Sequence, residues 1–112
     1  MSADRLVACL CAEWCGVCRE VRPLFDRLAQ DHPALRFEWI DIEDEAELMG
    51  DVDVETFPTL LIADGGEPKF FGPVLPRAEA FSAALRSVSA GARIADADVA
   101  ALARRLHSRL AR

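Results

Sequence analysis

The feature that most constrains this chain is a pair of cysteines, Cys15 and Cys18, at the point where an apolar run gives way to a helical pattern. Residues 6–12 are apolar, contain no Gly or Pro and are too few for a core helix, so they predict a buried strand. After the pair, apolar residues recur at helical spacing: Val17, Val21, Leu24, Phe25 and Leu28. Cys15 is therefore expected at the N-terminus of a helix.

The position of Cys15 favours redox chemistry, because unpaired backbone N–H groups at a helix N-terminus stabilise a thiolate. Cys18 lies one turn further on, with its Cβ about 5–6 Å from that of Cys15. A disulfide needs Cβ atoms about 3.8 Å apart, so only a small local adjustment separates the dithiol from the disulfide. This spacing predicts a reversible pair in which Cys15 is the nucleophile and Cys18 the resolving thiol.

The sequence Ala-Glu-Trp-Cys-Gly-Val-Cys at residues 12–18 resembles the active site of the thioredoxin family. Three further matches follow in the same order. Pro23 stands where thioredoxins carry a proline in the active-site helix, residues 56–59 (Thr-Phe-Pro-Thr) resemble their cis-proline loop, and residues 65–66 resemble the hairpin turn that follows. The resemblance extends from about residue 6 to residue 88.

The resemblance implies an α/β fold, namely a shortened thioredoxin fold with a four-stranded mixed sheet flanked by helices. We expect the usual N-terminal strand–helix unit to be absent and an extra C-terminal helix to be present. The resemblance also implies substrate-binding residues beside the cysteines and in the cis-proline loop: Trp14, Gly16, Val17, Phe57 and Pro58. Pro58 is the residue expected to follow a cis peptide bond.

Hydropathy and turn residues predict the remaining elements. Strands are expected over residues 36–42, 59–63 and 68–71, the last two forming a hairpin. Helices are expected over residues 15–30, 44–49 and 77–89, with a final helix that starts at Asp96 or Asp98 and ends near residue 111.

The C-terminal segment is predicted to belong to the same domain. We expect a thioredoxin-like domain over residues 1–92 and an additional helix in residues 93–112 that packs on it. One face of this helix is apolar: Val99, Leu102, Leu106 and Leu110. This face is suited to cover the side of the sheet that the missing helix would leave exposed. A monomer is therefore expected, with dimerisation through residues 97–111 as the competing outcome.

The chain departs from thioredoxins at three positions that are expected to modulate the site. Cys9 stands where thioredoxins hold a buried aspartate, Cys11 replaces an aromatic residue, and Trp39 stands where many have a lysine. Cys9 and Cys11 are interpreted as small buried side chains on a central strand, in surroundings that favour neutral thiols. The alternative is a four-thiolate metal site that combines them with Cys15 and Cys18. We expect no metal and no cofactor.

The net charge, the apolar segments and the number of cysteines argue against several classes of protein. The net charge of −6 argues against a nucleic-acid binder, and no segment is long enough to span a membrane. Four cysteines are too few for a disulfide scaffold, so we expect a cytoplasmic protein. The predicted function is thiol-disulfide exchange on protein disulfides, with a reductase or another thiol as electron donor. The alternatives are a glutaredoxin-like reductase and a non-catalytic thioredoxin-like binding or metal-handling module.

Overall fold

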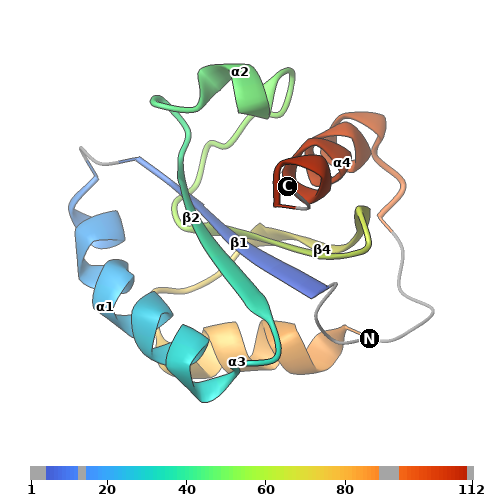
Figure 1. Ribbon diagram of the computed structural model, residues 1–112. Coiled ribbons are helices and arrows are strands. Elements are labelled where there is room, and N and C mark those ends of the chain that lie inside the picture. The colour runs from blue at the N-terminus through green and yellow to red at the C-terminus, as the bar shows by residue number, and fades with distance from the viewer. Residues whose placement is uncertain (1–4, 13–14, 89–93, 111–112) are drawn as a thin grey trace.

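The computed structural model describes residues 5–12, 15–88 and 94–110, without the side chain of Leu110. Four strands and four helices follow one another along these residues (Figure 1): β1 (Arg5–Cys11), α1 (Gly16–Asp31), β2 (Arg36–Asp41), α2 (Ala46–Met49), β3 (Thr59–Asp64), β4 (Glu67–Pro73), α3 (Ala78–Ser87) and α4 (Ala97–Leu110). The predicted elements are all present, with ends that differ by a few residues.

The four strands form one mixed sheet in the order β2-β1-β3-β4. β1 runs parallel to β2, with Cys11 opposite Asp41, and antiparallel to β3, with Leu10 opposite Thr59. β1 is thus an interior strand, and its side chains from Leu6 to Cys11 are buried. The α/β fold with a four-stranded mixed sheet, expected from the sequence, is confirmed.

The hairpin between β3 and β4 turns at Gly65 and Gly66, whose φ angles are +56° and +88°. A two-residue turn of this kind places both central residues at positive φ, which side chains disfavour and glycine permits. The two glycines therefore fix the antiparallel pairing of β3 with β4, as the sequence predicted.

Helices cover both faces of the sheet (Figure 1). Successive side chains of a strand point to opposite faces, so β1 contributes to two separate cores. On the first, here called the α1 face, Val7, Cys9 and Cys11 pack with residues of α1 and α3. On the second, the α4 face, Leu6, Ala8 and Leu10 pack with residues of α2 and α4.

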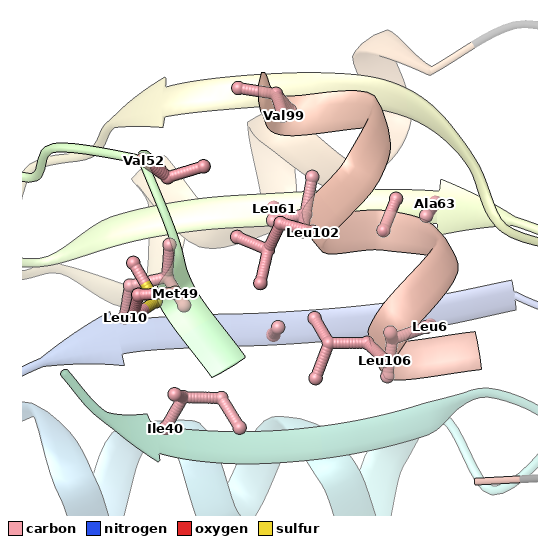
Figure 2. Packing of buried hydrophobic residues seen from close by; sticks show 12 residues of the cluster. Leu6, Leu10, Ile40, Met49, Val52, Leu61, Ala63, Val99, Leu102 and Leu106 are labelled. Carbon is pink, nitrogen blue, oxygen red and sulfur yellow. The ribbon is translucent and has the colours of Figure 1, made fainter. Parts of the chain in front are cut away.

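The apolar side of α4 lies on the α4 face (Figure 2). Val99, Leu102 and Leu106 are buried there among side chains of the sheet. The side chain of Leu110, the fourth residue of the predicted stripe, lies outside the described part. The division of the domain at residues 92 and 93 and the oligomeric state remain predictions.

Polar contacts fix α4 at its start and along its length. Asp96 caps it, because its Oδ1 accepts hydrogen bonds from the backbone N–H groups of Asp98 and Val99, at 2.9 and 3.1 Å. Arg105 donates from its guanidinium to the carbonyl oxygens of Leu48 and Met49, at 2.7 and 3.1 Å, and so binds the C-terminal end of α2. No helix in residues 5–12, 15–88 or 94–110 is both long and apolar enough to cross a bilayer.

Candidate functional site

Cys15 lies at the start of α1, between the end of β1 and the first helical turn. It is the N-cap residue, with an extended backbone (φ −83°, ψ 119°). Its N–H donates to the carbonyl of Ala12 at 3.0 Å, and its own carbonyl accepts from the N–H of Arg19 at 3.3 Å. The side chain is partly exposed, and its thiol is free. Cys15 is thus a partly exposed thiol at the N-terminus of a helix.

Cys18 lies one turn into α1, on the side that faces the sheet. It belongs to the buried stripe of that helix, together with Val21, Phe25 and Leu28, and is 1% exposed. Pro23 lies inside the same helix, as the sequence indicated. The two cysteines of the motif therefore occupy different environments, because Cys15 meets solvent and Cys18 meets the core.

Cys18 forms a disulfide with Cys11, with a Cα–Cα distance of 5.8 Å. The sequence predicted a reversible pair of Cys18 with Cys15. In the structure Cys18 is bonded to Cys11 instead, and the Cys15–Cys18 pair remains a prediction. The structural reason is that Cys11 ends β1 on the α1 face, directly beneath the first turn of α1, where Cys18 points inward. Sequence reasoning assigned Cys11 to the core or to a metal site and missed its role as a disulfide partner. The available signal was that Cys11 shares the strand face on which the following helix packs.

Cys9 is buried two residues before Cys11 on the same face of β1, and its thiol is free. Burial raises the pKa of Cys9 to about 12, while the nearby charge of Arg22 acts in the opposite direction. The thiol is therefore neutral at physiological pH. This agrees with the interpretation of Cys9 as a small buried side chain.

The loop before β3 contains a cis peptide bond between Phe57 and Pro58, as the sequence predicted. Pro58 is buried, and its carbonyl accepts from the N–H of Val74 at 3.1 Å. The hydroxyl of Thr59 donates to the carbonyl of Thr56 at 2.6 Å. The first contact ties the loop to the residue that follows β4, and the second ties it to the start of β3.

The structure brings most of the predicted site residues onto the α1 face. Cys9, Cys11 and Cys18 belong to its buried core, and four partly buried residues pack against that core: Cys15, Val17, Trp39 and Phe57. Gly16 is exposed at the first position of α1, where an added Cβ would lie 4.0 Å from the guanidinium of Arg19. Trp14 lies outside the described residues. The seven predicted residues of this cluster thus lie on one side of the sheet.

Trp39 lies on β2 opposite Cys9 and is partly buried. Its ring meets that of Phe25 edge-on at 5.7 Å, and the guanidinium of Arg22 lies 4.8 Å from its centroid. A pocket of about 340 Å³ opens beside these residues, lined by Cys18, Arg19, Arg22, Trp39, Asp41 and Asp44. Trp39 therefore forms part of the wall of a pocket that Cys18 also lines.

Within the described ranges, no group of three or more His, Cys, Asp or Glu side chains is placed to hold a metal ion. The four-thiolate alternative is therefore not assembled in this structure.

Comparison with known proteins gives one family. The family model described as Thioredoxin matches residues 1–86. A putative thioredoxin 2 of Streptomyces coelicolor is 35% identical over 88 residues, covering 78% of this chain and 62% of that protein. Thioredoxin-1 of Caenorhabditis elegans is 32% identical over 56 residues, covering 50% and 49%. The chain thus spans about half to three fifths of the length of these curated relatives.

Comparison with solved structures also gives thioredoxins. The solved thioredoxin of Fasciola hepatica superimposes with a TM-score of 0.69 at 20% identity, over 79% of this chain and 85% of that one. At this level of identity the likeness supports the fold alone.

Proposed function

This chain belongs to the thioredoxin family, and we propose that it is a thiol-disulfide oxidoreductase that reduces protein disulfides. The observation that carries the proposal is the placement of its motif. Cys15 offers a partly exposed thiol at the N-cap of α1, and Cys18 is buried one turn further along. Cys15 can therefore react with a substrate, while Cys18 is shielded from it and can react only with Cys15 afterwards.

The reaction begins when the Cys15 thiolate attacks one sulfur of a substrate disulfide. The other substrate sulfur leaves as a thiolate and takes up a proton, and Cys15 is joined to the substrate in a mixed disulfide. The Cys18 thiolate then attacks the sulfur of Cys15. The second substrate thiol is released, so the substrate has gained two electrons and the protein holds a Cys15–Cys18 disulfide. This step requires Cys18 to be reduced, and hence its bond to Cys11 to be open.

Substrate binding is assigned to the residues around Cys15 and to the loop before β3. An extended substrate segment would pair with the backbone at Phe57, beside cis-Pro58, as an added edge strand. Gly16 and Val17 follow the nucleophile in the first turn of α1, and the exposed Gly16 has no side chain that would obstruct a substrate chain. Trp14 is assigned the same role from the family resemblance.

The partners follow from the chemistry. Substrates are proteins with accessible disulfides, and the oxidised protein must be reduced by a reductase or another thiol donor. A reducing compartment such as the cytoplasm supplies such donors.

The Cys11–Cys18 bond favours one second candidate, a non-catalytic thioredoxin-like binding module. In that case the bond is a permanent part of the core, and Cys15 has no resolving partner. The buried position of both bonded cysteines is the observation that supports this alternative.

Insulin reduction in dithiothreitol tests the proposal. We expect the wild-type protein to accelerate precipitation of the insulin chains and the Cys15→Ser variant to be inactive. Cys9→Ser is the matched control, because it removes another thiol from the same face of the sheet. A wild-type protein no faster than dithiothreitol alone would overturn the proposed activity and favour the binding module.

A further inference from the structure

We propose that Cys11 is a third redox-active cysteine, which takes over the disulfide first formed between Cys15 and Cys18. The oxidised protein then stores its disulfide as Cys11–Cys18 and regains Cys15 as a free thiol. The inference rests on the proposed function, because the Cys15–Cys18 disulfide is its starting point.

Cys18 has a cysteine within reach on each side. Towards the sheet, its Cα lies 5.8 Å from that of Cys11, within the range of about 4.4–6.8 Å that disulfides require. Along the chain, Cys15 precedes it by three residues at the start of α1, a spacing that sets Cβ atoms about 5–6 Å apart on a helix. Cys11 is already bonded to Cys18, and Cys15 needs only a local adjustment of the first turn of α1 to reach it, so a change of partner leaves the fold in place.

The different burial of the three cysteines favours the Cys11–Cys18 pairing over the Cys15–Cys18 pairing. Cys11 is 0% and Cys18 1% exposed, whereas Cys15 is partly exposed at the helix N-cap. A disulfide carries no charge and loses little when it is buried in an apolar core, whereas a free thiol at the partly exposed N-cap stays in contact with solvent. Replacing the Cys15–Cys18 bond by a Cys11–Cys18 bond therefore places the disulfide in the core and the free thiol at the surface. The move also takes the disulfide out of reach of the substrate thiols just released.

The exchange balances within the protein. Cys11 gives up its proton, and its sulfur attacks that of Cys18. The Cys15–Cys18 bond breaks, and Cys15 leaves as a thiolate that takes up a proton. One S–S bond forms as another breaks, Cys11 is oxidised as Cys15 is reduced, and no external oxidant is consumed. Because Cys11 must lose its proton inside the core, we expect this step to be slower than formation of the Cys15–Cys18 bond.

Cys9 provides an internal comparison. It lies on the same strand and the same face as Cys11 and is equally buried, yet its thiol is free. Burial of a cysteine on this face is therefore not enough for redox activity. Position at the end of β1, beneath Cys18, is the feature that distinguishes Cys11.

Peptide mapping tests the relay, because Glu13 separates the two pairs of cysteines in the sequence. Trypsin and a Glu-specific protease together cut after Arg5, Glu13 and Arg19. Residues 6–13 then carry Cys9 and Cys11, and residues 14–19 carry Cys15 and Cys18. A Cys15–Cys18 bond closes a loop within the second peptide, whereas a Cys11–Cys18 bond links the two peptides.

Reduced wild-type protein is mixed with excess insulin, quenched with acid and N-ethylmaleimide at intervals, digested and analysed by mass spectrometry. We expect the looped peptide first and the linked peptides later, the latter carrying N-ethylmaleimide on Cys15. The Cys9→Ser variant should still pass from the looped to the linked form, because Cys9 takes no part in the relay. The Cys11→Ser variant should stop at the looped peptide. The Cys15→Ser variant should form the linked peptides at least about ten-fold more slowly than the wild type, since buried thiols do not reach insulin.

A wild-type protein that reduces insulin and stays in the looped form would overturn the relay and leave the proposed function intact. Linked peptides that form as fast in Cys15→Ser as in the wild type would also overturn it, because the bond would then arise without Cys15. A wild-type protein that neither reduces insulin nor forms the loop would overturn both. The wild-type time course distinguishes the first of these outcomes from the third even if a variant does not fold.

Discussion

Replacing Leu102 with alanine should destabilise the protein strongly, because α4 closes one whole face of the sheet. Leu102 is 0% exposed and lies in the core of the α4 face with Leu61 and Leu106 (Figure 2). Truncating a buried leucine removes its transfer free energy and leaves a cavity, at a combined cost of about 2–5 kcal/mol. A domain of this size is stable by only about 5–15 kcal/mol, so the loss is a large fraction of the total.

The control is Leu75→Ala, the same chemical change at a leucine that is 60% exposed. Its cost should stay within about 0.5 kcal/mol. Both variants are unfolded in urea in the same reducing buffer, so that the state of the thiols contributes equally. We expect the urea midpoint of Leu102→Ala to fall with an unchanged m-value, and its melting temperature to fall by roughly 10 °C or more.

The result that would refute this reasoning is a Leu102→Ala variant as stable as Leu75→Ala. Such a result would mean that α4 does not cover the sheet in solution. The cysteines lie on the opposite face, so accessibility of the four thiols below the unfolding transition should be the same in both variants.

Two further predictions concern Cys9 and the start of α4. The pKa of Cys9 is raised from 9.0 to about 12, so the unfolded chain loses this proton first. Between these two pH values the free energy of unfolding should therefore fall by up to about 1.4 kcal/mol per pH unit more in the wild type than in Cys9→Ala, measured by urea unfolding of reduced protein. Parallel pH profiles of the two proteins would contradict the buried neutral thiol. Asp96→Ala should cost about 1 kcal/mol through loss of the helix cap and Asp98→Ala clearly less, and equal losses would contradict the capping role.

The sequence was sufficient for the elements whose patterns are local. The apolar run of β1, the helical spacing in α1 and the paired glycines of the hairpin each predict a structure from neighbouring residues. The cis bond before Pro58 followed from the family resemblance, since a lone proline carries little such information.

The disulfide partner of Cys18 could not be predicted in this way. Residue spacing and the family pattern both pointed to Cys15, whereas the bond to Cys11 depends on how closely the first turn of α1 packs on the end of β1. That distance is set by the whole α1 face and not by any local pattern. The contact of Arg105 with the carbonyls of Leu48 and Met49 was missed for the same reason, because tertiary packing alone brings α4 beside α2.

The most direct test of the central claim is to identify the cysteine that joins the substrate. In Cys18→Ser the second step is blocked, so a substrate attacked by the protein stays attached as a mixed disulfide. We expect mass spectrometry of the insulin adduct to place the mixed disulfide on Cys15. The double variant that carries both Cys15→Ser and Cys18→Ser should form no adduct. An adduct on Cys9 or Cys11, or no adduct at all, would contradict the assignment of Cys15 as the nucleophile.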